Sequence, residues 1–249
     1  MKRTLSFSIL VALALTAVHR PAMAGKKVLY FTHEPGRWHK YTAQKKIFEQ
    51  IGKKAGWEVT VMSGDHDGQI AKLRTPDFAK GYDAIVYNFC FAHSKDLEAQ
   101  ANLVAQTREH GVPAMLIHCA MHTYRAASFD DWRKFLGVTS RRHEHQSEYP
   151  VKKVIKNHPI LKGMPDDWKT PKDELYVVDK LWPGAKALAT SISERNKKEH
   201  AVIWTHQHGK ARVFGTTYGH SDATFRDPVF LNYVSRGLLW AAERLDTKK

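Results

Sequence analysis

With 249 residues, 43% of them hydrophobic and 26% charged, the chain is long enough to bury the core of an α/β domain. Its two cysteines exclude a disulfide-rich scaffold and leave two states open, a single bridge or two buried thiols. The formal net charge is +14, but the basic residues form short, scattered clusters without a nucleic-acid-binding motif. We therefore expect a solvated basic surface and no nucleic-acid partner.

Residues 1–24 have the pattern of a secretory signal peptide. Lys2 and Arg3 give a basic start, residues 5–18 are mostly apolar, and Ala22-Met23-Ala24 fits the small-x-small pattern that precedes a cut before Gly25. A retained N-terminal anchor is the alternative. No later stretch is long and apolar enough to span a bilayer. The sequence thus predicts that residues 25–249 form a single periplasmic or secreted domain without stable membrane insertion.

Beyond the signal sequence, apolar strands alternate with amphipathic helices. Strands are expected at 27–32, 58–62, 83–89 and 114–117, and helices at 42–55, 95–110 and 129–136. This alternation is typical of a mostly parallel sheet covered by helices. Residues 138 to about 180 interrupt this alternation of strands and helices. We interpret them as an excursion from the sheet, that is, a segment that leaves it.

Further strands and a helix are expected in the last third of the chain. Strands are expected at 187–193, 201–204 and 212–217, with a hairpin turn at 207–210 between the last two. A closing helix is expected at 227–244, with Pro228 in its first turn.

Histidines fall where predicted strands end. His33, His118 and His220 each close an apolar run, and the carboxyl ends of parallel strands are where α/β sheets bind ligands. The imidazoles of His33, His118 and His145 are therefore candidate ligands for a divalent transition metal, zinc first among them. His39 is a candidate substrate contact on the loop after the first strand. Two alternatives stay open, a polar ligand site without metal and a set of histidines that only orient loops.

Several segments, taken in order, resemble the ThuA-like (trehalose utilisation) family of the class I glutamine amidotransferase-like superfamily. They are Phe31-Thr32-His33 with His39, the run at 116–120, His158-Pro159-Ile160, the run at 173–176, the run at 204–214, Gly219-His220, and the run at 236–240. The resemblance implies a flavodoxin-like three-layer α/β sandwich. It also implies the handling of disaccharides and their keto derivatives.

The same resemblance draws attention to a nucleophile and to two carboxylates. Cys119 follows a strand where amidotransferase-like proteins place their cysteine, and His220 lies late in the chain beside an acid. No glycine flanks Cys119, however, which favours a small buried residue instead. Glu174 is a candidate general acid or base, and Asp173 beside it a candidate substrate contact. The alternatives are an ion pair of Glu174 with Arg212 and a cap on a backbone turn.

Two aromatic residues are candidate stacking partners for a sugar ring, Trp38 and Tyr124, because each follows a strand at the expected site edge. Together these features predict an exported protein that acts on a small carbohydrate, with Glu174, His220 and Cys119 as candidate catalytic residues. The alternatives are a non-catalytic sugar-binding protein and a Cys119-dependent amidohydrolase. The sequence does not decide whether the chain forms a homo-oligomer.

Overall fold

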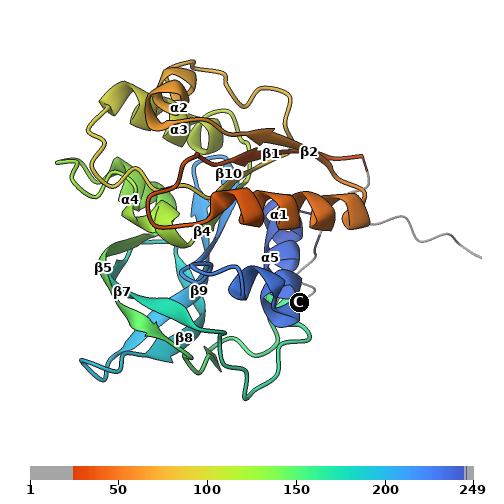
Figure 1. The fold of residues 1–249 in the computed structure, drawn as a ribbon, viewed down its shortest axis with the longest axis vertical. Coiled ribbons are helices and arrows are strands. Elements are labelled where there is room, and N and C mark those ends of the chain that lie inside the picture. The colour runs from red at the N-terminus through yellow and green to blue at the C-terminus, as the bar shows by residue number, and fades with distance from the viewer. Residues whose placement is uncertain (1–24, 244, 246–249) are drawn as a thin grey trace, which may run out of the picture.

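A mixed sheet of eight strands, in the order β2-β1-β3-β4-β10-β9-β8-β6, runs through the part of the chain that the structure describes. This computed structural model describes residues 25–243 and 245, so the predicted signal sequence lies outside the described residues (Figure 1). The strands, including the two of a second sheet, are β1 Lys27–Phe31, β2 Glu58–Met62, β3 Ala84–Tyr87, β4 Ala114–Ile117, β5 Val138–Ser147, β6 Lys152–Lys153, β7 Asp173–Leu181, β8 Lys186–Ile192, β9 Glu199–His208 and β10 Ala211–Thr216.

Helices cover both faces of the large sheet. They are α1 Tyr41–Ala55, α2 His66–Leu73, α3 Leu97–Arg108, α4 Asp131–Leu136 and α5 Pro228–Ala241, with short 3-10 turns η1 His118–His122, η2 Pro159–Leu161 and η3 Thr224–Arg226. One apolar core packs α1 and α5 against one face, and a second packs α3 and α4 against the other (Figure 1). This is the three-layer α/β sandwich that the sequence predicts. No described helix has the length and apolar character needed to cross a membrane.

The parallel half of the sheet brings five strand ends to one edge. β1 pairs in parallel with β2 and β3, β3 with β4, and β4 with β10. The residues of β3 and β4 are fully buried because helices cover both faces, which is why these strands are continuous apolar runs in the sequence. β9, β8 and β6 extend the sheet with antiparallel pairs. The predicted hairpin between β9 and β10 is confirmed.

The predicted excursion from the sheet contains a second, two-stranded sheet of β5 and β7. Three register shifts interrupt its antiparallel pairing. These irregularities break the alternation of buried and exposed residues, so the sequence gives no clear strand signal there. β5 and β7 lie beside the sandwich at lower left in Figure 1. They bring a polar strand pair up to the carboxyl ends of the parallel strands.

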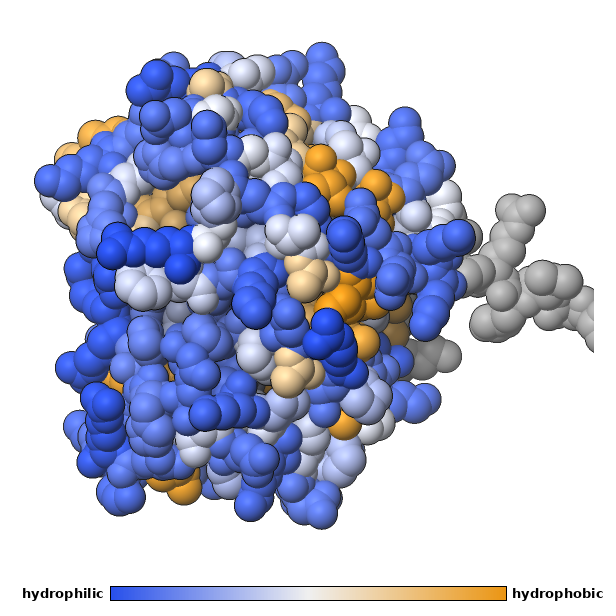
Figure 2. All heavy atoms as spheres, in the orientation of Figure 1, coloured by the Kyte–Doolittle hydropathy of each residue, from blue (hydrophilic) through white to orange (hydrophobic). Residues whose placement is uncertain are grey.

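Smaller differences concern short elements. The sequence analysis does not predict α2, which begins after Asp65, whose side chain accepts a hydrogen bond from the Gly68 amide and caps the helix. β9 extends beyond the expected 201–204 because it pairs along both β8 and β10. On the face shown in Figure 2 the surface is mainly hydrophilic, as the charged composition predicts.

Candidate functional site

A cavity of about 570 Å³ opens at the carboxyl ends of the parallel strands. Six histidines line it, together with one carboxylate and two arginines. Its lining residues are His33, Arg37, Trp38, His39, Tyr41, Cys90, Ala92, His93, Cys119, His122, Arg125, His143, Gln146, Glu174, Tyr176 and His220. A cavity therefore lies at the edge of the sheet where the sequence predicts a ligand site.

Three imidazoles converge at the edge of the cavity, where His39 and His220 line it and His118 is buried next to them. His39 comes from the loop between β1 and α1, His118 from the end of β4, and His220 from the turn after β10. One ring nitrogen from each lies within 4.8 Å of the other two. The ring centroids of His39 are 4.8 Å from those of His118 and 4.9 Å from those of His220. We refer to these three residues as the histidine cluster.

His118 is fixed by hydrogen bonds on both ring nitrogens. Its Nδ1 lies 2.7 Å from the carbonyl oxygen of Thr217, which can only accept, so Nδ1 carries a proton. Nε2 faces the cluster, 3.2 Å from the hydroxyl of Tyr176 and 3.5 Å from Oε2 of Glu174. The backbone of His118 has a φ of +47°, a left-handed conformation that non-glycine residues rarely adopt. This turn directs the ring from the end of β4 into the cluster.

Glu174 on β7 lies among the histidines. Its Oε2 is 3.3 Å from Nδ1 of His220 and 3.5 Å from nitrogens of both His118 and His143. Burial alone would raise the pKa of Glu174, but the hydrogen bonds with His118 and His220 outweigh it and hold that pKa well below its usual range. Burial lowers the pKa of His220, yet the contact with Glu174 raises it more. Glu174 therefore stays ionised at neutral pH. It does not pair with Arg212, which lies 3.6 Å from Glu243.

His39, by contrast, is held in its uncharged form. Burial, followed by the neighbouring charges of His118 and His220, lowers the pKa of His39 to about 2. The ring is therefore neutral at physiological pH. Its Nδ1 is buried and has no hydrogen-bond partner among the described residues. A neutral imidazole with an unused nitrogen is the form in which histidine binds a metal ion.

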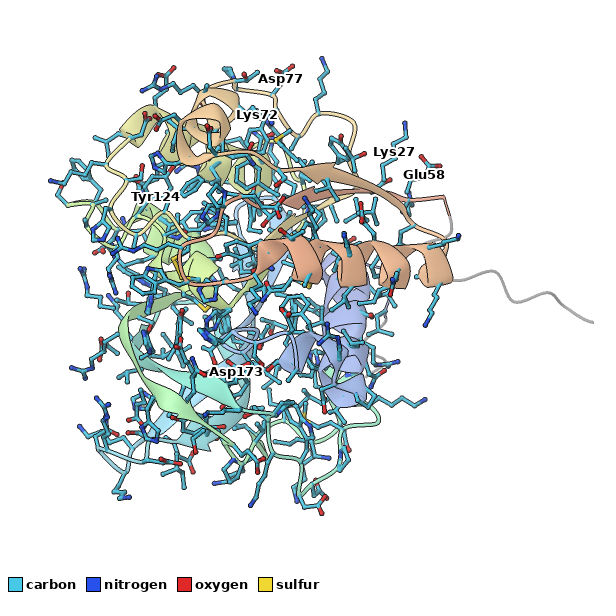
Figure 3. The ribbon with its side chains drawn as sticks, viewed as in Figure 1. Lys27, Glu58, Lys72, Asp77, Tyr124 and Asp173 are labelled. Carbon is cyan, nitrogen blue, oxygen red and sulfur yellow. A yellow bond between two sulfur atoms is a disulfide. The ribbon has the colours of Figure 1, made fainter. Side chains whose placement is uncertain are left out.

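Asp173 lies behind the site and not in it. Its side chain is fully buried, and its carboxylate accepts hydrogen bonds from the backbone amides of Gly219 (3.0 Å) and His220 (3.2 Å) and from the hydroxyl of Thr224 (2.5 Å). Figure 3 labels Asp173 at the start of β7. The expectation that Asp173 contacts substrate is corrected, because no surface of its side chain reaches the cavity. Asp173 instead fixes the turn that carries His220.

Only one of the two predicted aromatic contacts lies at the cavity. Trp38 lines the cavity and is 66% exposed, so it is available for stacking. Tyr124, labelled in Figure 3, is fully buried and packs edge-on against Trp132 at 5.9 Å. Tyr124 belongs to the core between the sheet and α4 and is not a substrate contact. The sequence could not separate them, because both follow strand ends.

The three predicted metal ligands do not lie together in the structure. His118 belongs to the histidine cluster, but His33 does not. The ring of His33 lies between Tyr41 and Phe91, with centroids 4.8 and 4.9 Å away. His145 is half exposed, pairs with Glu194 at 2.7 Å and does not line the cavity. His39 and His220 lie next to His118 instead.

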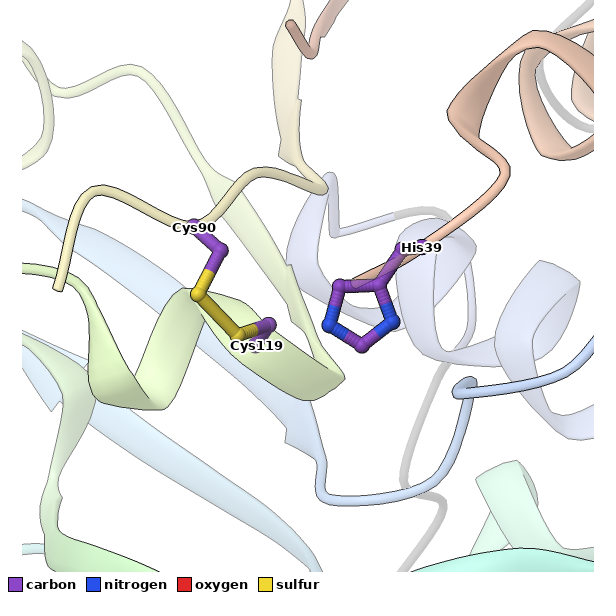
Figure 4. Close-up of side chains that lie close together, drawn as sticks. All are labelled: His39, Cys90 and Cys119. Atoms are coloured by element: carbon purple, nitrogen blue, oxygen red, sulfur yellow. A yellow bond between two sulfur atoms is a disulfide. The ribbon is translucent and has the colours of Figure 1, made fainter. Parts of the chain in front are cut away.

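Cys119 forms a disulfide with Cys90, which follows β3 (Figure 4). The bridge ties the segments after β3 and β4 together beside His39 and lines the cavity. This settles the choice that the sequence left open between a bridge and two thiols. In this state Cys119 has no thiol with which to attack a substrate, so the structure does not support its candidate role as a nucleophile.

The sequence analysis missed several site residues. Tyr176 and Gln146 come from the β5–β7 sheet, and Arg37 and Arg125 from loops. Gln146 contacts Nε2 of His220 at 2.7 Å. Tyr176 could have been found, because it lies two residues after Glu174 on one strand and so shares its face. The loop residues carry no such signal.

Comparison with known proteins agrees with this architecture. The trehalose-utilisation (ThuA) family matches residues 27–241. No curated protein is similar enough to this chain to count as a match. Among solved structures, a ThuA-like protein from Parabacteroides merdae shares 22% identity with a TM-score of 0.71, covering 90% of this chain and 92% of its own. A ThuA-like protein from Bacteroides uniformis shares 16% identity with a TM-score of 0.68, covering 95% of each chain.

A more distant likeness is to a β-galactosidase from Rahnella sp. R3. It shares 13% identity with a TM-score of 0.58, and the match covers 86% of this chain but 31% of the β-galactosidase. At such identities these structures bear on the fold alone, and they confirm the predicted flavodoxin-like α/β architecture. Since the family match spans nearly all of the described residues, this chain belongs to the trehalose-utilisation (ThuA) family.

Proposed function

We propose that this protein is an exported enzyme that acts on a carbohydrate, a disaccharide or a keto-sugar, at the cavity with the histidine cluster. The observation that carries the proposal is the convergence of three imidazoles around an ionised carboxylate at one cavity. Among the described residues, His39 keeps a buried nitrogen without a hydrogen-bond partner, as His33 also does, and the ring of His39 additionally lies against the rings of His118 and His220. Such an arrangement is typical of a site that acts on a ligand.

The cavity suits a small polar molecule. Its volume lies within the range of roughly 300–1,000 Å³ that is usual for small-molecule sites. The exposed indole of Trp38 offers a flat apolar surface at its edge, and imidazole and amide groups offer hydrogen bonds. Stacking on an aromatic ring combined with polar contacts is how proteins commonly hold sugars. The description of the family, trehalose utilisation, supports the same ligand class.

We further propose that His39, His118 and His220 hold a divalent transition metal, with zinc as the first candidate. The donor set fits, because three nitrogen ligands leave a coordination position for water or substrate. The Thr217 carbonyl fixes the tautomer and orientation of His118, as outer hydrogen bonds commonly do for metal-binding histidines. When bound, such a metal supplies Lewis-acid polarisation of a substrate oxygen.

Glu174 and His220 are the residues that we assign to proton transfer and orientation. Glu174 is ionised and can accept a proton from a substrate hydroxyl next to the cluster. Where no metal is present, the pair of His220 and Glu174 is itself an acid–base pair, with Nδ1 and Oε2 3.3 Å apart. The export that the signal sequence predicts is consistent with the Cys90–Cys119 bridge, because disulfides persist in oxidising compartments.

Elemental analysis of the purified chain starting at Gly25 tests the metal, before and after chelation and after incubation with zinc or manganese. We expect near-stoichiometric metal in the parent protein and its loss in His39→Ala, His118→Ala and His220→Ala. His145→Ala is the matched control, because this exposed histidine lies outside the cluster and should leave the metal content unchanged. A parent protein that stays metal-free after incubation would overturn the metal assignment.

The carbohydrate assignment is tested by screening disaccharides and their keto derivatives for turnover. We expect His118→Ala and Glu174→Gln to lower kcat/KM by at least 100-fold, while His145→Ala retains parental turnover. Unchanged turnover in His118→Ala would contradict the assignment. Saccharide binding without any product on long incubation would favour a non-catalytic sugar-binding protein. We do not propose a thiol-dependent amidohydrolase, because Cys119 is bonded to Cys90.

A further inference from the structure

The cavity carries two arginines that no acidic side chain neutralises. Arg37 comes from the loop after β1 and Arg125 from the segment after η1, and both line the cavity. Within residues 25–243 and 245, neither guanidinium forms an ion pair with a carboxylate, whereas Arg74, for example, pairs with Asp96 at 2.6 Å. Glu174, the one carboxylate of the lining, is already surrounded by three histidines. The excess positive charge therefore faces the ligand space.

Arg125 is partly buried, and no carboxylate among the described residues pairs with its guanidinium. Its Nη1 donates a hydrogen bond to the carbonyl oxygen of Arg141 at 3.2 Å, which leaves other guanidinium donors free. The charge of Arg125 acts on the cavity interior. After burial, it is the largest contribution that lowers the pKa of the cavity residue His122.

Arg37 lies at the exposed edge of the same cavity. Its guanidinium carbon is 4.7 Å from the centroid of the Trp38 ring, so the two planar groups form a cation–π pair. The indole is 66% exposed, more than any other described large apolar side chain. A stacking surface for a sugar ring and a planar, always-charged donor group thus lie side by side.

We propose that the natural ligand of this cavity is an anionic saccharide, a sugar whose carboxylate is recognised by Arg37 and Arg125. A uronate-containing disaccharide is the simplest ligand of this class. The planar fork of guanidinium donors matches a carboxylate, and such charge-assisted hydrogen bonds are among the stronger polar contacts in proteins. This inference rests on the proposed carbohydrate function and adds the charge of the substrate to it.

Isothermal titration calorimetry at pH 7.5 tests the inference with three matched probes. They are a neutral glucosyl disaccharide, the same disaccharide with glucuronate in place of one glucose, and its 6-phosphate. We expect the glucuronate form to bind at least tenfold more tightly than the neutral form, with the advantage shrinking as salt concentration rises. Arg125→Gln and Arg37→Gln should each remove most of this advantage. Arg142→Gln is the control, because Arg142 is exposed, pairs with Asp179 and does not line the cavity.

The outcomes separate this inference from the function on which it rests. Equal affinities for the neutral and the acidic disaccharide would overturn the anionic ligand and leave a carbohydrate function intact. A preference that survives in both arginine variants would also overturn it. If no saccharide of either charge binds, both proposals fail. Tighter binding of the 6-phosphate than of the glucuronate would replace the carboxylate with a phosphate and overturn the carboxylate assignment.

Discussion

Burial keeps several histidines of this protein neutral. His33 is 7% exposed and lies between two aromatic rings, where an imidazolium would lose most of its hydration. Burial, then the charge of His66, lowers the pKa of His33 to about 4. The same cause acts on His39 in the cluster. The neutral imidazoles of His33 and His39 are therefore a consequence of packing, and they make the folded protein sensitive to acid.

This depressed pKa of His33 predicts a loss of stability in mild acid. An unfolded histidine takes up a proton as the pH falls through about 6.5, whereas His33 in the folded protein does so only near 4. The free energy of unfolding therefore decreases between these values, by on the order of 2 kcal/mol at pH 5 from His33 alone. Urea unfolding at pH 7.5 and pH 5 measures the decrease. His33→Gln should show a smaller decrease, His145→Gln the parental one, and an unchanged decrease in His33→Gln would refute the linkage.

Asp173 illustrates a residue that acts on the site through the backbone. In Asp173→Asn one acceptor oxygen becomes an NH₂ donor that faces the amides of Gly219 and His220. We expect a destabilisation of about 2–3 kcal/mol, because a buried donor is left without an acceptor. We also expect the titration of the His220 ring, followed by NMR, to shift. Thr224→Val removes a single hydrogen bond to Asp173 and should shift it less. A parental His220 titration in Asp173→Asn would argue against the positioning role.

At the scale of elements, the site depends on how closely neighbouring segments approach. Gly219 has a φ of +132°, and a Cβ there would lie 2.7 Å from the Ile117 side chain, so glycine lets the turn after β10 reach the end of β4. Gly237 has the same role between α5 and β10, because a Cβ would lie 2.3 Å from the Phe214 ring. Sequence periodicity identifies the elements, but these contacts set their distances.

The bridge between Cys90 and Cys119 joins the segments after β3 and β4 across a sequence separation of 29 residues. Such a cross-link restricts the unfolded chain, and a loop of this size corresponds to about 3.5 kcal/mol. We expect a reducing agent to lower the free energy of unfolding by that amount, measured by urea unfolding. The double variant Cys90→Ser/Cys119→Ser should show the lower stability with and without reductant. Equal stability of the oxidised and reduced parent would contradict this expectation.

The close contact between Gly237 and the Phe214 ring gives a second prediction for the packing of elements. Gly237→Ala places a methyl group against the Phe214 ring, where α5 packs on β10. Overpacking of this kind costs about 1–3 kcal/mol, so thermal unfolding should occur at a lower temperature. Ser235→Ala on the same helix is the control, because Ser235 is not fully buried. A parental melting temperature in Gly237→Ala would mean that α5 shifts to accommodate the methyl group.

At the scale of the whole molecule, the site joins parts of the chain that are far apart in sequence. His39, His118, Glu174 and His220 come from four segments, which the parallel sheet and the β5–β7 sheet bring to one edge. A ligand that contacts all four acts as a non-covalent cross-link of the native state. The occupancy of the site is therefore coupled to the stability of the fold.

This coupling gives a test that does not require an assay of activity. Zinc added to the metal-free protein should raise the melting temperature, with a stabilisation of about 4 kcal/mol when its concentration is 1,000 times the Kd. The increase should disappear with a chelator and in His39→Ala, and persist in His145→Ala. Differential scanning calorimetry across a zinc series measures it. A melting temperature that does not change with zinc would argue against a metal site formed by folding.

By itself the sequence determined the α/β class, the order of most strands and helices, and the edge of the sheet at which His118 and His220 lie, because apolar periodicity and strand-end positions are local properties. Only the tertiary structure decided which histidines cluster, since whether His39 or His145 reaches His118 depends on loop paths and on the irregular β5–β7 sheet. It also decided that Cys119 is bridged and that Tyr124 and Asp173 are buried. The physical reason is that burial and side-chain contact arise from segments distant in sequence, which no local pattern encodes.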